Sequence, residues 1–340
     1  MRRGSILQLV LFALVAGGAA MTLALVPGWL PHPASREAGR IDFVFWFVTV
    51  ICVAIFAIVA AVIVYSLLKF RARPDDDLDG TPIHGHTGLE IAWTAVPTVL
   101  VIAIAIVSAI VLAKNGHAGA NPLRVNVTGQ QFAWSFSYPS QGGITSGTLR
   151  LPVGRSVKLD LRSRDTDVIH SFWVPEFSQK QDLLPGMTTH LVITPDRLGT
   201  FPVICTELCG LGHSAMRTTA IVMPQQAFAA WARTQRKAVA KGGAEGGKAV
   251  FAANGCGSCH TFAPAGTTGK VGPDLDKLPA EAKGAGKPLA DFIRQSIVDP
   301  NAYVEPHFPK GVMPSTFAQL PKSQLDALVQ YLLQSRKGAR

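Results

Sequence analysis

The sequence predicts a multi-domain membrane protein with three parts: a two-helix transmembrane hairpin, a β-barrel or β-sandwich, and an all-α domain near its C-terminal end. Three observations predict this fold class: two long uncharged apolar stretches, a middle region of short alternating runs, and a last region with helical patterning. Hydrophobic residues make up 48% of the 340 residues and charged residues only 16%, which indicates a chain partly embedded in lipid.

The hairpin is predicted over residues 41–114. Residues 43–68 and 91–113 contain no charged side chain, and each stretch exceeds the roughly 20 residues that a helix needs to cross a bilayer. Trp46 and Trp93 lie toward the ends of these stretches, as aromatic residues at membrane interfaces do. Both stretches are therefore expected to span the membrane.

The N-terminal residues 1–26 are predicted to be a signal peptide. Arg2 and Arg3 precede an apolar run that contains the small residues Gly18, Ala19 and Ala20. Because the run is long for a signal, an uncleaved anchor is the alternative. The net charge of +10 is scattered over the chain, so no nucleic-acid partner is expected.

Residues 120–224 are predicted to form an antiparallel barrel or sandwich. Apolar and polar residues alternate over residues 123–127, 157–161 and 190–193, and Gly and Pro separate such runs. Residues 225–246 are expected to be a linker, in which a short helical stretch gives way to a flexible glycine-rich part at 241–247. Residues 247–340 follow as the helical domain.

A soft-metal site is predicted between residues 205 and 216. Four side chains with soft or borderline donor atoms fall within this segment: Cys205, Cys209, His213 and Met216. Thiolate, thioether and imidazole together suit copper, and two thiolates can bridge two copper ions. Each copper then needs a terminal imidazole, and His170 in an apolar strand is the best second candidate. Met216 and the backbone carbonyl of Glu207 would be the weak ligands.

Two other interpretations of these residues remain open. Two Cys and two His could hold a structural zinc ion, and Cys205 and Cys209 could form a disulfide. A zinc ion would leave Met216 and the tight loop unexplained. His117 and His190 have no other donor residues beside them and are expected to be ordinary residues.

The pattern Cys-x-Glu-x-Cys-Gly-x-x-His-x-x-Met, with the upstream His-Ser, resembles subunit II of cytochrome c oxidase, the CuA-binding subunit. The resemblance covers roughly residues 40–224 and includes the aromatic strand at 131–138 and the segment at 89–94. It implies a cupredoxin-like barrel that stands outside the membrane on a two-helix anchor.

The resemblance also implies roles for individual residues. Glu207 would offer its carboxylate to a magnesium ion shared with subunit I, and Glu90 would lie near the mouth of a proton-uptake path. An acid favoured by the helix dipole is an equally good explanation of Glu90. The tryptophan through which electrons enter this family is Phe132 here, and Trp134 and Tyr138 match other members of the aromatic cluster.

A second cofactor site is predicted at Cys256-Gly257-Ser258-Cys259-His260, the attachment motif of haem c. The two thiols can add to the two vinyl groups at one porphyrin edge, and the following imidazole lies beneath the iron. Met313 is the expected sixth ligand, because a thioether raises the iron potential as an electron carrier requires. No further cysteine pair follows that could complete a zinc site.

Residues 245–336 resemble class I cytochrome c. Gly247-x-x-x-Phe251 and Tyr331 match its crossed terminal helices, and Pro273 matches the position whose carbonyl orients the proximal histidine. Because haem c is attached on the outer side of the bacterial cytoplasmic membrane, the copper and haem domains are expected in the periplasm or its equivalent. The hairpin loop would then face the cytoplasm.

Together these resemblances imply the electron-accepting subunit II of a proton-pumping, caa-type bacterial oxidase. Electrons would pass from a donor, such as a cytochrome c or a quinol–cytochrome c reductase, through haem c and CuA to subunit I, which reduces oxygen to water. No catalytic residue is expected in this chain, because the oxygen site lies in another subunit. The flexible linker would hold the haem near the copper at millimolar effective concentration. Two alternatives remain: the CuA subunit of a nitric oxide reductase, and a free-standing membrane-anchored electron carrier.

Overall fold

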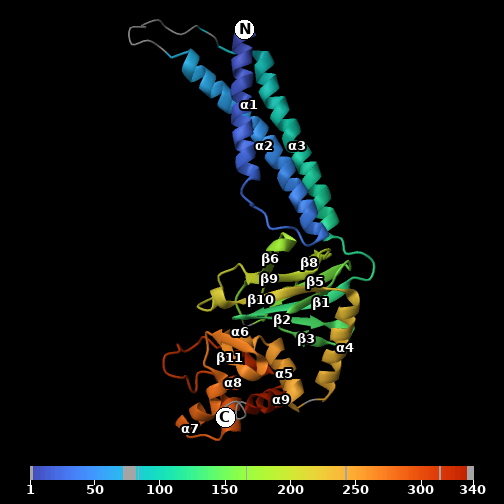
Figure 1. Cartoon of the computed structure of the whole chain (residues 1–340), viewed down its shortest axis with the longest axis vertical. Helices are drawn as coiled ribbons and strands as arrows, with labels where there is room; N and C mark the ends of the chain where they lie inside the picture. The colour runs from blue at the N-terminus through green and yellow to red at the C-terminus, as the bar shows by residue number, and fades with distance from the viewer. Residues whose placement is uncertain are drawn as a thin grey trace. The chain divides into compact units, whose positions relative to one another are not determined.

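The structure is a computed structural model that describes residues 3–71, 82, 84–165, 167–241, 243–313 and 315–334. The chain divides into two compact units. One contains residues 1–32 and 39–114, and the other contains residues 33–38 and 115–340. Figure 1 labels the helices and strands of both units.

The first unit consists of long apolar helices, α1 (Arg3–Leu25), α2 (Arg36–Lys69) and α3 (Thr87–Gly116). Within the described residues, three helices are long and apolar enough to cross a membrane, by length and composition. The two helices of the predicted hairpin are α2 and α3, and α1 covers the apolar run that was predicted to be a signal peptide or an uncleaved anchor. Gly17 of α1 lies close to α2, since a Cβ there would be 3.3 Å from Ala57 Cβ. Cleavage of residues 1–26 stays a prediction, and most of the predicted cytoplasmic loop, residues 72–81 and 83, lies outside the described residues.

The middle of the chain forms a β-sandwich whose sheets are stacked face to face (Figure 1). The described strands form two five-stranded sheets, in the orders β3-β2-β1-β5-β8 and β4-β10-β9-β6-β7. Their bounds are β1 (Leu123–Gln130), β2 (Ala133–Tyr138), β3 (Ile144–Ser146), β4 (Leu149–Pro152), β5 (Val157–Ser163), β6 (His170–Val174), β7 (Gln179–Leu183), β8 (Thr189–Ile193), β9 (Gly199–Cys205) and β10 (Arg217–Met223).

The sequence predicted a purely antiparallel sandwich, and this prediction is wrong. β1 pairs with β5 and β4 pairs with β10 in parallel register. Parallel neighbours need a long crossover connection, and here intervening strands supply it in both cases. Along β1 the apolar side chains Leu123, Val125 and Val127 are buried in the core, whereas Arg124 and Asn126 are exposed. This alternation is what made the strand recognisable in the sequence.

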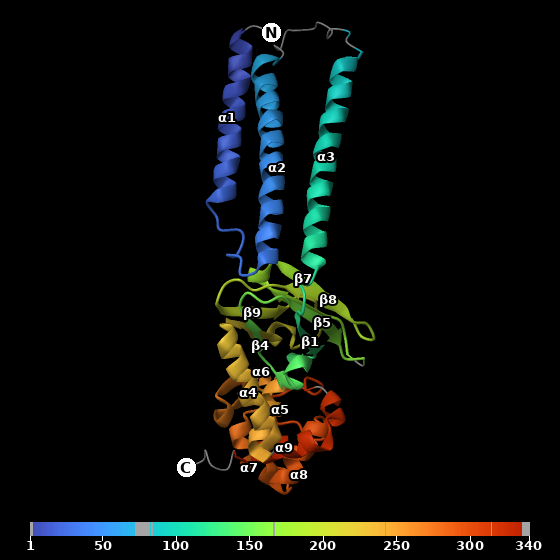
Figure 2. The same cartoon turned by 90° about the vertical axis from the view of Figure 1, so that its right-hand side faces the viewer.

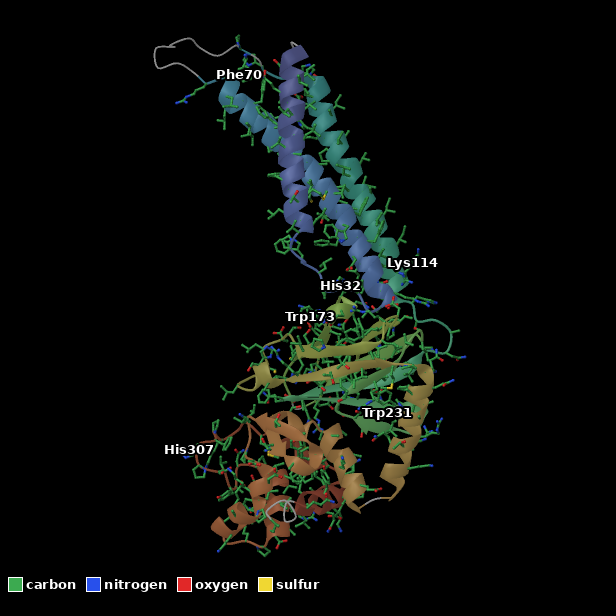
Figure 3. All side chains as sticks on the ribbon, in the orientation of Figure 1. His32, Phe70, Lys114, Trp173, Trp231 and His307 are labelled. Atoms are coloured by element: carbon green, nitrogen blue, oxygen red, sulfur yellow. The ribbon has the colours of Figure 1, made fainter. Side chains whose placement is uncertain are left out.

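The predicted linker is largely a helix, α4 (Gln225–Lys241), packed on the sandwich. Phe228 and Trp231 of α4 pack against Tyr138 in tilted and edge-on contacts, with ring centroids 6.0 and 5.1 Å away, and Figure 3 labels Trp231 beside the strands. The Arg150 guanidinium lies 5.2 Å from the Trp231 ring centroid. The sequence predicted a short helical stretch here, but composition does not reveal that its apolar side chains pack on the sandwich.

The last region is a small helical domain below the sandwich in Figure 2. Its helices are α5 (Gly243–Ala253), α6 (Cys256–Cys259), α7 (Leu278–Gly284), α8 (Leu289–Val298) and α9 (Lys322–Leu332). It is not all-α, because β11 (His260–Phe262) pairs with β12 (Thr267–Lys270). The described glycines after 242 belong to α5 rather than to a flexible segment. Gly247 brings α5 and α9 together, since a Cβ there would lie 2.0 Å from Ala327 O.

Candidate copper and haem sites

The predicted copper ligands come from the start of β6 and from the loop that joins β9 to β10. β9 ends at Cys205, β10 begins after Met216, and the ligand loop lies between them. β6 pairs antiparallel with β9, with Phe172 opposite Cys205. This register places His170, at the start of β6, beside the end of β9.

The structure brings the six predicted donor groups together around the two thiols. The Sγ atoms of Cys205 and Cys209 are 3.9 Å apart, and both cysteines are free of disulfides. His170 Nδ1 lies 3.9 Å from Cys205 Sγ, and His213 Nδ1 lies 3.4 Å from Cys209 Sγ. The remaining contacts are Cys209 Sγ to Met216 Sδ, 3.7 Å, and Cys205 Sγ to Glu207 O, 3.3 Å.

The donor atoms are shielded from water. His170 and Met216 are fully buried, and Cys205 and Cys209 are nearly so. The hydrogen bond between the two thiols lowers the pKa of Cys205 to about 3 and, with burial, raises the pKa of Cys209. The two sulfur atoms thus share one proton, and a metal cation bound between them can replace that proton.

His170 has a carboxylate behind it. Burial alone would lower the pKa of its imidazole, but the nearby Asp167 carboxylate and Cys205 thiol outweigh burial and raise it. Asp167 Oδ2 lies 3.7 Å from His170 Nε2, the ring nitrogen that faces away from the thiols. A carboxylate in this place orients an imidazole ligand. Sequence analysis missed Asp167, although an acid three residues before a candidate ligand was a usable signal.

These residues fit a copper pair. Within the described residues, donor atoms of His170, Cys205 and Cys209 lie within 4.8 Å of one another, all buried. Two buried thiols with imidazole and thioether neighbours form a soft donor set, which suits copper better than a hard cation. The side chain of Glu207 is exposed.

The aromatic residues divide into two groups. Phe132 packs on the ligand loop, since a Cβ at Gly212 would lie 2.4 Å from Phe132 Cδ2. The Trp134 indole donates a hydrogen bond of 3.3 Å to the Met216 carbonyl. Tyr138 lies at the other end of β2, where it packs on α4 and accepts a hydrogen bond from the Arg150 backbone N–H. Only the first two are therefore next to the ligands.

Glu90 lies in the first turn of α3, in the other unit. Its Oε1 accepts a hydrogen bond of 3.1 Å from the His86 backbone N–H. This contact closes the start of the helix, which is the local role that a helix-start acid would have. The proton-path role stays a prediction.

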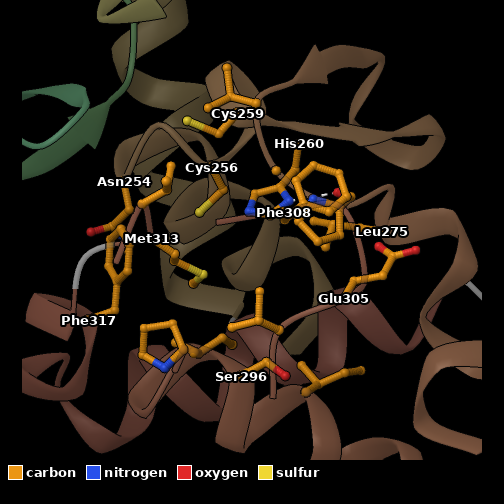
Figure 4. A pocket seen from close by; sticks show the side chains of 18 of the residues that line it. Asn254, Cys256, Cys259, His260, Leu275, Ser296, Glu305, Phe308, Met313 and Phe317 are labelled. Atoms are coloured by element: carbon orange, nitrogen blue, oxygen red, sulfur yellow. Dashed lines mark hydrogen bonds between the residues drawn. The ribbon is translucent and has the colours of Figure 1, made fainter. Parts of the chain in front are cut away.

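The predicted haem residues line one cavity in the helical domain. Cys256, Cys259, His260 and Met313 all face it (Figure 4), and its empty volume is about 1320 Å³ with its open side included. His260 Nδ1 lies 2.7 Å from the Pro273 carbonyl oxygen, which leaves Nε2 available for a metal. Burial lowers the pKa of His260, so the ring is held neutral, as a ligand must be. Apolar walls and this donor set fit a haem.

The cavity wall continues into the sandwich. Gln131, Phe132 and Ala133 line the cavity together with the haem residues. Gly255, which precedes Cys256, permits this approach, because a Cβ there would lie 2.5 Å from Ala133 Cβ. The sequence placed residues 131–133 in an aromatic strand but held no sign that they face the haem.

Comparison with known proteins gives three family matches in chain order. The transmembrane domain of cytochrome c oxidase subunit II matches residues 23–111, its periplasmic domain matches 144–223, and cytochrome c matches 244–336. The cytochrome c oxidase subunit 2 of Synechocystis is 34% identical over 60% of this chain and 75% of the relative. That of Alkalihalophilus pseudofirmus is 31% identical over 84% of both chains. The crystal structure of the periplasmic domain of subunit II from Bradyrhizobium japonicum is 27% identical over 36% of this chain and 98% of that one, with a TM-score of 0.34.

Proposed function

From the premise that the chain belongs to the cytochrome c oxidase subunit II family, with a cytochrome c domain fused to it, we propose that it receives electrons at a haem c and delivers them through CuA to subunit I. Membership makes it a subunit of a haem–copper cytochrome c oxidase, as predicted. Because the chain belongs to this family, the nitric oxide reductase and free-carrier alternatives are not pursued. The observation that carries the proposal is the gathering of six donor groups around two buried thiols, together with the cavity that the predicted haem residues line.

The copper pair would be held by two bridging thiolates, Cys205 and Cys209. His170 and His213 would be the terminal imidazoles, with Met216 and the Glu207 carbonyl as weak ligands. The short distances between these groups and their burial support this assignment. A buried, rigid donor set suits one-electron transfer, because little has to rearrange when the charge on the metal changes.

The haem would be attached to Cys256 and Cys259, with His260 and Met313 as axial ligands. The hydrogen bond between His260 and the Pro273 carbonyl supports this, because it fixes the ring with Nε2 toward the cavity. The haem, when bound, supplies reversible one-electron chemistry. The residues of this chain exclude water from it and hold the neutral imidazole in place.

The finer roles rest on fewer contacts. Glu207 is proposed to offer its exposed carboxylate to a magnesium ion shared with subunit I, and Glu90 to stand near a proton-uptake path. Phe132 and Trp134, next to the ligand loop, are better placed than Tyr138 to assist electron transfer into the copper pair.

The proposed location is the bacterial inner membrane, with the copper and haem domains on the outer side. Subunit I and membrane lipid would surround the apolar helices. The donor would be a cytochrome c or a quinol–cytochrome c reductase. The packing of α4 on the sandwich supports a haem domain held at the barrel rather than on a loose tether.

Two measurements on the purified oxidase test this proposal. Electron paramagnetic resonance should show hyperfine splitting from two equivalent copper nuclei, and metal analysis that finds zinc or a single copper at the loop would refute the site. Met313→Ala should slow oxygen consumption from an external donor, because the haem loses its thioether ligand. Met187→Ala, at an exposed methionine, is the matched control. Unchanged consumption in Met313→Ala would contradict the relay.

A further inference from the structure

Gln131 makes hydrogen bonds to the two parts of the chain that supply copper ligands, the loop after β9 and the segment that leads into β6. Its side-chain Nε2 donates a hydrogen bond to the Cys209 carbonyl. Its backbone N–H donates a hydrogen bond of 2.8 Å to Asp167 Oδ2, the oxygen that faces His170 Nε2. Gln131 therefore contacts the loop ligand Cys209 directly. Through Asp167 it also contacts the surroundings of His170, the ligand on β6.

The same residue belongs to the wall of the haem cavity. Gln131 lines the cavity with Phe132 and Ala133, and both cofactor domains lie in one compact unit. Phe132 presses on the ligand loop at Gly212, and Ala133 meets the chain at Gly255, directly before the first haem thiol. The short segment 131–133 is thus a shared wall between the two sites.

A wall that contacts both sites offers a route by which the state of one site can affect the stability of the other. If the copper loop is ordered, Gln131 has a fixed acceptor and the cavity wall is fixed with it. If the loop is disordered, the Cys209 carbonyl is lost as a partner and the wall can shift. Such coupling is reciprocal, so whatever copper binding does for the haem domain, haem binding does for copper affinity.

We propose that Gln131 is a positioning residue that couples the two sites, so that copper bound at the ligand loop stabilises the haem domain. The proposal rests on the ligand assignments of the proposed function. It concerns how the sites hold each other in shape, and it requires no bond to form or break apart from the binding of copper.

The test uses the full chain in its oxidase complex, with haem attached. Haem absorbance follows the thermal unfolding of the haem domain, before and after copper is removed by a chelator. In the parent protein, copper removal should lower the midpoint by about 4 °C or more, the effect of one ordinary hydrogen bond on a domain of this size. Gln131→Met keeps the side-chain length but loses the donor, and should abolish most of this shift.

Gln225→Met is the matched control. Gln225 Nε2 also donates to a backbone carbonyl, that of Val153, but it contacts neither site. This variant should keep the full copper-dependent shift. Equal shifts in Gln131→Met and the parent protein would overturn the coupling, and so would the absence of any shift in the parent.

A spectrum recorded before copper removal separates this proposal from the assignment on which it rests. Loss of the two-copper signal in the parent protein would refute the proposed copper site. A normal signal in Gln131→Met, together with an unreduced shift, would refute only the coupling. Loss of the signal in Gln131→Met alone would also overturn the coupling, since Gln131 would then be needed simply to build the copper site.

Discussion

Replacing Gly247 with Ala should destabilise the haem domain, because this glycine is where α5 crosses α9. A Cβ at position 247 would lie 2.0 Å from Ala327 O, 2.7 Å from Ala327 C and 2.6 Å from Tyr331 Cβ. Two of these three atoms are backbone, so the helices themselves must move apart. Overpacking of this kind costs about 1–3 kcal/mol. For a domain of this size each kcal/mol lowers the melting temperature by about 4–8 °C.

The neighbouring Gly246 gives a control one residue away. It is also buried in α5, but a Cβ there would meet only Ala327 Cβ, at 3.9 Å. Ala is favoured over Gly inside a helix by roughly 0.5–1 kcal/mol. Gly246→Ala should therefore leave the melting temperature unchanged or raise it.

The assay is thermal unfolding of the full chain in detergent, followed by haem absorbance. Gly247→Ala should melt several degrees below the parent protein, and Gly246→Ala should not. If Gly247→Ala melts at or above the parent temperature, the helix crossing does not depend on that glycine. An equal fall in both variants would mean that glycine flexibility, rather than close approach, matters in this segment.

Three further predictions concern other parts of the second unit, which contains residues 33–38 and 115–340. Burial, as the main cause, and repulsion from Glu305, as the second, raise the pKa of Glu281 from 4.5 to about 7. The folded protein therefore holds the carboxyl proton of Glu281 more tightly than the unfolded chain does. That stabilisation is present below about pH 4.5 and is lost as the pH rises through about 7, so Glu281→Gln should raise the melting temperature near pH 8 and not near pH 4.5; equal effects at both pH values would contradict this. Asp167→Asn should weaken copper retention by about 10- to 100-fold in a chelator titration, because His170 loses its orienting carboxylate; unchanged retention would show that the strand alone positions the ring. Phe228→Ala should cost about 3–5 kcal/mol in denaturant unfolding of the sandwich, since this side chain is 4% exposed between α4 and the strands; a cost well under 1 kcal/mol would mean that α4 is not held by this ring.

The copper and haem donors could be chosen from the sequence because their chemistry is local. Cys205 to Met216 and Cys256 to His260 are short motifs whose spacing limits what they can bind. His170 was a longer inference, based on the need for a second imidazole. Its place beside Cys205 depends on the pairing of β6 with β9, which the sequence does not contain.

The sequence by itself determined which segments are apolar enough for a membrane, which run alternates as a strand, and which side chains can bind soft metals. These properties depend on residue type and spacing within a few turns of chain. Tertiary structure alone decided the parallel strand pairs, the packing of α4 on Tyr138, and the use of residues 131–133 as a wall between two sites. Each of these is a contact between residues far apart in sequence, and the residues around one partner do not indicate which distant residue it will meet. The motif Gly247-x-x-x-Phe251 pointed to Gly247, but only the structure shows that a Cβ there would meet the backbone of α9, whereas one at Gly246 would not.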